Sequence, residues 1–129
     1  MYLVSLFDDQ PVIEASLGGR VDVVEMKLFS EEVALLFNDL MNTPFYLLID
    51  YSKTACFDQK TTSALNALKD KAFRAGAVKI FSVPQEDTEI EEHLSGRMQF
   101  VLEGREEFII HARHAQFPPL PTLPDTLAA

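Results

Sequence analysis

The run "FYLLIDY", residues 45–51, constrains the fold most, because apolar side chains occupy consecutive positions. A strand with one solvent-exposed face alternates apolar and polar residues, so a run that is apolar on both faces predicts a central strand covered on both sides. The runs "VKIFSV" (78–83) and "MQFVL" (98–102) share this pattern and predict two more buried strands. Strands of this kind separated by helical segments indicate an α/β fold with a mostly parallel sheet.

The N-terminal third predicts strands followed by a helix. Tyr2–Phe7 and Val12–Leu17 are apolar-rich runs around "DDQP", which predicts two antiparallel strands joined by a turn, and Gly18-Gly19 offers a second tight turn. Residues 21–41 fit two patterns: the alternation of Val24, Met26 and Leu28 favours a strand, whereas Met26, Phe29, Val33, Phe37 and Leu40 recur at helical spacing. Ser30, followed by two glutamates, has the signature of an N-cap. We therefore predict a third strand from Val21 and a helix at about Ser30–Met41.

The remaining helices are predicted from their end signals. A helix at about Gln59–Ala75 ends at Gly76, a natural C-terminal stop. The segment "EDTEIEEHL" (86–94) predicts a short acidic helix, and "REEFIIHARHA" (105–115) a last helix, with a strand hairpin across Glu103-Gly104 as the alternative. The expected fold is a single-domain α/β sandwich with a mixed, mostly parallel central sheet, N-terminal antiparallel strands and about four helices.

Charge and cysteine content limit the function classes. Eleven Lys+Arg against twenty Asp+Glu give a net charge of -9, which repels phosphate backbones and anionic membranes, so neither nucleic acid nor a membrane is an expected partner. The apolar N-terminal stretch has no cationic lead and is too short for a signal peptide or a membrane span. A single cysteine, Cys56, forms no internal disulfide, so the cytoplasm is the expected location.

A length of 129 residues suits one domain, which we place at residues 1–117, followed by a proline-rich tail at 118–129. Four prolines within seven residues favour an extended polyproline conformation. The tail is either a docking peptide of the PxxP type or a disordered or surface-draped terminus, and the second interpretation is favoured. Deletion from Pro118 onward is then expected to change stability little.

Two aspartates flank the loop after the central strand. Asp50 falls at the carboxyl end of the strand, where ligands and partners usually meet an open α/β sheet. Asp58 falls directly before a helix, where its carboxylate would accept hydrogen bonds from free backbone N–H groups. Capping alone explains Asp58 well.

The spacing of Asp50, Ser52 and Asp58 resembles the core of the STAS domain family, which includes SpoIIAA-like anti-sigma factor antagonists. In that family a buried strand ends in an Asp-x-Ser type turn and leads to an apolar pair, here Cys56-Phe57, and a helix-capping aspartate. The resemblance covers roughly residues 10–116. It implies a non-enzymatic domain that binds another protein, of the kinase or anti-sigma regulator class, through the region 50–63 and the loop 82–87. The implied contact residues are Asp50, Ser52, Asp58, Gln59, Thr61, Thr62, Ser82 and Gln85.

The chain departs from the family at the position that matters for regulation. In anti-sigma factor antagonists the serine directly after the capping aspartate is phosphorylated, and phosphorylation switches binding off. Gln59 occupies that position here and has no hydroxyl group, while Lys60 and Thr61 replace the following serine and glycine. The resemblance therefore implies a binding domain without the phosphorylation switch.

Other candidate sites have simpler explanations. Cys56 lacks a Cys/His motif around it and is expected to be a packed hydrophobe rather than a nucleophile. Glu107, His111 and His114 would share a helix face and could bind a metal, but a solvated helix end is favoured, and no cofactor or metal is expected. Ten phenylalanines leave open a domain that binds a small hydrophobic ligand or lipid between helix and sheet. A homodimer also stays open, and an enzyme is the least favoured class.

Overall fold

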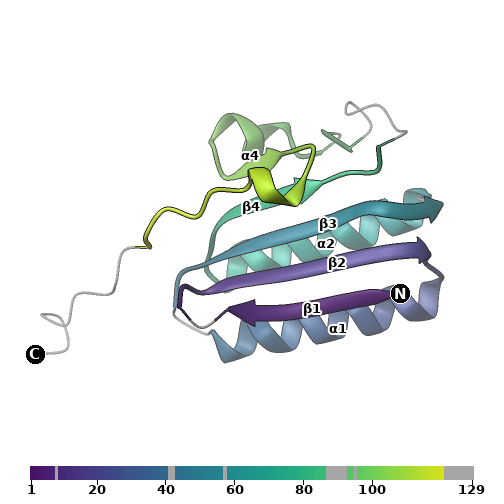
Figure 1. Cartoon of the computed structure of the whole chain (residues 1–129), viewed down its shortest axis with the longest axis horizontal. Coiled ribbons are helices and arrows are strands. Elements are labelled where there is room, and N and C mark those ends of the chain that lie inside the picture. Colours follow the sequence, from purple (N-terminus) through teal and green to yellow (C-terminus); the bar gives the residue numbers. More distant parts are fainter. Residues whose placement is uncertain (8, 41–42, 57, 87–92, 95, 121–129) are drawn as a thin grey trace, which may run out of the picture.

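The computed structural model of the chain contains one five-stranded sheet with the order β1-β2-β3-β4-β5 (Figure 1). The structure describes residues 1–7, 9–40, 43–56, 58–86, 93–94 and 96–120. Its strands are β1 (Tyr2–Phe7), β2 (Val12–Arg20), β3 (Phe45–Cys56), β4 (Ala77–Val83) and β5 (Glu106–Phe108). Its helices are α1 (Val23–Asp39), α2 (Gln59–Ala75), α4 (Met98–Leu102) and a 3-10 helix at Ala112–His114.

The sheet is mixed and mostly parallel, as predicted. β1 pairs with β2 antiparallel, whereas the pairs β2/β3, β3/β4 and β4/β5 are all parallel. Parallel neighbours need a crossover, and α1 and α2 provide the crossovers that follow β2 and β3. Both helices lie on the same face of the sheet (Figure 1). The described part of the chain contains three α-helices and one 3-10 helix, where about four helices were expected.

The main core lies between the two long helices and the sheet. Alternate residues of β3, namely Phe45, Leu47, Ile49 and Tyr51, face this core and are at most 2% exposed. They meet Phe29 and Phe37 from α1 and Leu65 and Leu68 from α2. β3 is therefore covered on its helical face as the sequence predicts.

The C-terminal segment covers part of the opposite face of the sheet. Tyr46, Leu48 and Phe81 form a second core with Val12 and Val83, against which Ile109, Ala112, Ala115, Phe117 and Leu120 pack. The backbone oxygen of Pro118 accepts hydrogen bonds from the Tyr46 hydroxyl at 2.7 Å and from Gln10 Nε2 at 2.7 Å. Pro118 and Leu120 thus contact the fold, which counts against the expectation that deletion from Pro118 onward leaves stability unchanged.

The predicted start of the first long helix is wrong. α1 begins at Val23, with Asp22 as its N-cap: the Asp22 carboxylate accepts a hydrogen bond from the Glu25 backbone N–H at 2.7 Å. Ser30 lies inside the helix, and residues 21–28 form no third strand. This stretch forms a helix rather than a strand because a helix places its four buried residues on one face, from which all of them reach the core. These residues are Met26, Phe29, Val33 and Phe37.

Two C-terminal predictions are also wrong. "MQFVL" forms α4 rather than a buried strand: Met98 and Leu102 are exposed, and Phe100 stacks on Phe73 of α2 with a ring separation of 4.8 Å. "REEFIIHARHA" forms β5 and the 3-10 helix rather than one long helix. The alternative hairpin across Glu103-Gly104 is wrong as well, since β5 pairs in parallel with β4. Most of the predicted acidic helix at 86–94 lies outside the described residues.

A buried ionic cluster explains how a strand as polar as β5 joins the sheet. Glu106 is 1% exposed, and its two carboxylate oxygens accept hydrogen bonds from Lys69 Nζ at 3.1 Å and from Arg97 Nε at 2.9 Å. Arg97 Nη1 also reaches Asp70 at 2.6 Å. Burial lowers the pKa of Lys69 to about 8, although the negative charge of Glu106 acts in the opposite direction. The cluster therefore ties β5 to α2 and to the loop before α4.

Candidate functional site

Asp58 is the N-cap of α2, as the sequence predicts. Its backbone is extended, with φ −93° and ψ 177°, and its carboxylate accepts hydrogen bonds from the Thr61 backbone N–H at 2.8 Å and the Thr61 hydroxyl at 2.9 Å. The Thr62 hydroxyl donates to the Asp58 backbone oxygen at 3.1 Å. Gln59 and Lys60 are exposed, whereas Thr61 is only 8% exposed. The first turn of α2 thus offers an amide and an ammonium group to solvent, while both threonine hydroxyls donate hydrogen bonds to Asp58.

The hydrogen bonds from Thr61 lower the pKa of Asp58 from its ordinary value of 3.8, the backbone N–H contributing most and the hydroxyl next. A carboxyl group whose pKa is lower in the folded state stabilises the fold above the unfolded pKa. This contribution is lost as the pH falls through the folded pKa. The charge of Asp58 therefore supports α2 at neutral pH and ceases to do so in acid.

We expect Asp58→Ala to lower the melting temperature by a few degrees at pH 7, because the first turn of α2 loses its N-cap. Asp58→Asn is the matched control, since asparagine also caps helices and removes only the charge. Melts should show a smaller loss for Asp58→Asn, and that loss should shrink as the pH is lowered below 3.8. An Asp58→Ala variant that melts like the wild type would show that this cap does not stabilise α2.

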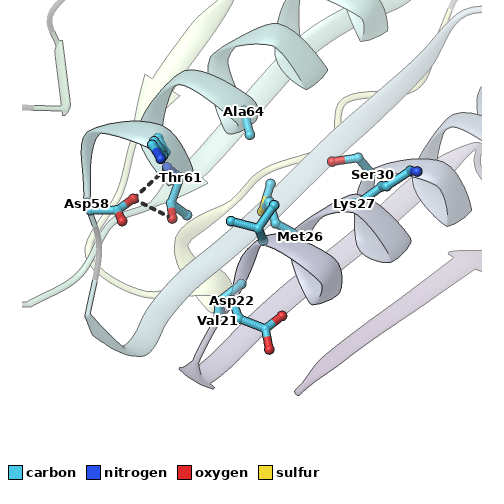
Figure 2. A pocket seen from close by; sticks show the side chains of 10 residues that line it. Val21, Asp22, Met26, Lys27, Ser30, Asp58, Thr61 and Ala64 are labelled. Carbon is cyan, nitrogen blue, oxygen red and sulfur yellow. Dashed lines mark hydrogen bonds between the residues drawn. The ribbon is translucent and has the colours of Figure 1, made fainter.

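A groove with a volume of about 410 Å³ lies between the N-terminal parts of α1 and α2 (Figure 2). Both helix N-caps, Asp22 and Asp58, line it, and most of its surface is apolar. Figure 2 shows Met26 of α1 between the two helices and the two hydrogen bonds from Thr61 to Asp58. The complete lining is Val21, Asp22, Val23, Met26, Lys27, Ser30, Asp58, Lys60, Thr61 and Ala64.

Asp50 and Ser52 lie on the other face of the sheet from the helices. They follow Leu48 at alternate positions of β3, and Leu48 belongs to the core beneath the C-terminal segment. Asp50 accepts hydrogen bonds from the Ser52 backbone N–H at 3.0 Å and from the Ser52 hydroxyl at 2.6 Å. β4 pairs with β3 only as far as Asp50, and β3 continues to Cys56 with β2 as its one strand neighbour among the described residues. The predicted site therefore divides into two parts, one on each side of the extended end of β3.

The two predicted contact residues around the end of β4 differ in exposure. Ser82 is completely buried, and its hydroxyl has no hydrogen-bond partner among the described residues. Gln85 lies after the strand and donates a hydrogen bond from Nε2 to the backbone oxygen of Thr54 at 2.5 Å. Gln85 therefore holds the loop against the extended end of β3, whereas Ser82 does not reach the protein surface.

Asp22 and the groove beside it are not predicted from the sequence. The only local sign that Asp22 is an N-cap is its position as a polar residue before an apolar repeat with helical spacing. Ser30 has the same property eight residues later. The three residues considered as metal ligands are not on one helix, and the solvated helix end favoured for them is not formed: Glu107 lies in β5, and His111 caps the 3-10 helix by accepting a hydrogen bond from the Arg113 backbone N–H at 3.1 Å. Among the described residues no three potential ligands are grouped around a metal site. The side chain of Cys56 lies outside the described structure, so its packing stays a prediction.

Comparison with known proteins identifies the fold. No protein-family model matches the sequence, and no curated protein sequence is similar to it. A solved structure of the anti-sigma factor antagonist SpoIIAA in its unphosphorylated form superposes with a TM-score of 0.52 and 10% sequence identity. The match covers 84% of this chain and 88% of that chain. This chain has the SpoIIAA fold.

The SpoIIAA fold accounts for the position of the site. Its parallel strands β2, β3 and β4 all end at the same edge of the sheet, and α1 and α2 both begin there. The capping aspartates, Gln59 and the groove are therefore at the edge where partners of open α/β sheets usually bind. None of the helices that the structure describes is long and apolar enough to cross a membrane.

Proposed function

We propose that this chain is a cytoplasmic, non-enzymatic regulatory domain that binds another protein through the first turn of α2. The observation that carries the proposal is the exposure of Gln59 directly after the Asp58 cap and beside the apolar groove. An apolar surface rimmed by polar groups is typical of a protein interface. The solved structure with the same fold is an anti-sigma factor antagonist, which favours a regulatory partner such as an anti-sigma factor or its kinase.

The proposed contact surface is smaller than the set of residues chosen from the sequence. Asp58, Gln59, Lys60 and Thr62 form its centre. Asp50, Ser52 and Gln85 stay as a second part at the extended end of β3, and Ser82 is left out because it is buried. Thr61 acts through Asp58, since its hydroxyl and its backbone N–H both donate to that carboxylate. We expect affinity to depend on the exposed residues and on the orientation of the α2 N-terminus.

We further propose that binding is constitutive. Gln59 has no hydroxyl group to accept a phosphate, and the next hydroxyl, on Thr61, is buried and donates to Asp58. The Thr62 hydroxyl is engaged with the Asp58 backbone oxygen. A kinase would have to break these hydrogen bonds before it reached either threonine. A phosphate at Thr61 could still gain from the helix N-terminus, so the decisive test is the modification state in the cell.

We expect a photoreactive amino acid at Gln59 to cross-link one specific protein in cells of the source organism. The same amino acid at Leu102 is the matched control, because Leu102 is 80% exposed on α4. Mass spectrometry of the cross-linked bands should identify a protein captured from position 59 and absent from position 102. The same adducts from both positions, or none from position 59, would contradict a binding surface at the start of α2.

The groove supports a second candidate function, the binding of a small hydrophobic ligand. A volume of about 410 Å³ is within the range of small-molecule sites, and the lining is mainly apolar. Ala64→Trp would fill the groove from the α2 side. Native mass spectrometry of the purified protein should show a bound small molecule in the wild type and none in Ala64→Trp if this candidate is right, and unliganded wild type would reject it.

A further inference from the structure

The outward faces of α1 and α2 carry opposite charges. α1 contains four acidic residues, Glu25, Glu31, Glu32 and Asp39, and a single basic one, Lys27. Glu25 and Glu32 contact the amino group of Met1 and the hydroxyl of Tyr2, so Glu31 and Asp39 carry the acidic charge of the outward face. The basic residues Lys60, Lys71 and Arg74 of α2 are all exposed. Asp70 is directed toward the buried cluster, where it pairs with Arg97. α1 and α2 lie on the same face of the sheet (Figure 1). Their exposed charges therefore form an acidic strip on α1 and a basic strip on α2.

α1 also exposes a stripe of large apolar side chains. Val24, Leu28 and Leu35 are 67%, 48% and 62% exposed. Spacings of four and seven residues place all three on one side of a helix, opposite to the buried residues that face the sheet. On α2, the exposed residues Ser63 and Ala67 are small. Bulky side chains on one helix thus face the same way as small ones on its neighbour.

The charges that border the stripe are not neutralised by the described part of the chain. Glu31, Asp39, Lys71 and Arg74 form no ion pair among the described residues. Asp39 lies in the last turn of α1, where a negative charge opposes the helix dipole, and no basic residue accompanies it. An external basic surface would compensate this charge and cover the apolar stripe.

We propose that this surface binds a second copy of the chain, with α1 of each copy packed on α2 of the other. α1 and α2 follow parallel strands and run in the same direction. A two-fold axis parallel to the helices, placed between two facing helix layers, brings each acidic, apolar α1 over a basic α2. By symmetry, this complementary contact between α1 and α2 occurs twice in the dimer. The charged pairs steer the association, and burial of Leu28 and Leu35 against small residues supplies the apolar contact.

Charge reversal tests the arrangement in the full chain. The acid-side variant is Glu31→Lys with Asp39→Lys, and the base-side variant is Lys71→Glu with Arg74→Glu. Light scattering coupled to gel filtration should show a wild-type dimer whose dissociation constant increases with salt, because exposed charge pairs are screened. Each variant alone should raise that constant at least about tenfold. An equimolar mixture of the two variants should form a heterodimer, and a chain with all four substitutions should dimerise again.

A matched control separates this contact from a general charge effect. Lys53→Glu with Arg113→Glu changes the net charge as much as the base-side variant, at two exposed positions outside both helices. This control should dimerise like the wild type, and circular dichroism should confirm that every variant is folded. A wild type that stays monomeric at every concentration would overturn the proposal. So would a dimer that neither reversal weakens, which would place its interface elsewhere.

Discussion

Glu106→Gln is expected to lower the free energy of unfolding by about 3–5 kcal/mol, because it removes the only carboxylate that both Lys69 and Arg97 contact in the described structure. Lys69 and Arg97 are each 1% exposed, so neither charge can turn to water without opening the packing between α2 and β5. A buried charge without its partner keeps the cost of desolvation and loses the attraction that offset it. Urea denaturation of the purified variant measures the loss.

Glu107→Gln is the matched control for this experiment. Glu107 is the next residue of β5, and its side chain is 47% exposed and pairs with Lys79 at 3.3 Å. Exposed pairs of this kind contribute less than about 1 kcal/mol. Equal losses for Glu106→Gln and Glu107→Gln would show that the buried cluster does not hold β5.

The loss caused by Glu106→Gln should become smaller as the pH is raised from 7 toward 8. In the wild type the pKa of Lys69 is about 8, below its ordinary value of 10.5, and the charge of Glu106 is one of the factors that raise it. Removal of Glu106 lowers this pKa further, so Lys69 of the folded variant loses its proton at lower pH than in the wild type. Between this lowered pKa and the ordinary pKa of Lys69, the unfolded variant binds one proton more than the folded variant. The free energy of unfolding of the variant therefore rises more steeply with pH than that of the wild type.

Gly76→Val is expected to cost about 2 kcal/mol of unfolding free energy, because Gly76 ends α2 with φ +120° and ψ 10°. A residue with a Cβ atom, and a β-branched one above all, is strained at positive φ. The Cβ atom itself has room, because it would lie 3.5 Å from the Thr43 backbone oxygen, an ordinary contact. Backbone strain is therefore expected although the Cβ atom fits.

Gly18→Ala is the control for Gly76→Val. Gly18 is in β2 outside the positive-φ region, and a Cβ atom there would meet only the Cβ atom of Lys53 at 3.8 Å. Thermal and urea melts of the two variants should show a clear loss for Gly76→Val and little change for Gly18→Ala. A small effect at both positions would show that α2 can end with another backbone conformation.

Local signals predicted the centre of the fold well. The bounds of α2 follow from Asp58 and Gly76, because a cap and a positive-φ glycine act on the helix that they border. Runs of consecutive apolar residues predicted the positions of β3 and β4. A strand that is covered on both faces needs apolar side chains at every position, and this pattern is visible in the sequence.

Tertiary contacts determine the elements that the local sequence does not predict. β5 contains Glu106, whose burial depends on Lys69 of α2 and on Arg97 in the loop before α4, so no apolar pattern marks the strand. α1 begins seven residues before its predicted start, at Val23 rather than Ser30, because its buried face continues through Met26 and Phe29. The same error hid the groove, whose α1 side begins at Asp22. Asp58 was correctly identified as a cap because that role depends on its immediate neighbours alone.

Mapping of phosphorylation at residues 58–63 in protein purified from its own host tests most directly the claim that this surface binds without a switch. The protein is separated into a free pool and a pool bound to its partner, and the same peptide is quantified in both. We predict that Thr61 and Thr62 are unphosphorylated in both pools, since Gln59 offers no acceptor and both threonine hydroxyls are engaged with Asp58. Phosphate at either threonine in the free pool, and its absence from the bound pool, would contradict constitutive binding.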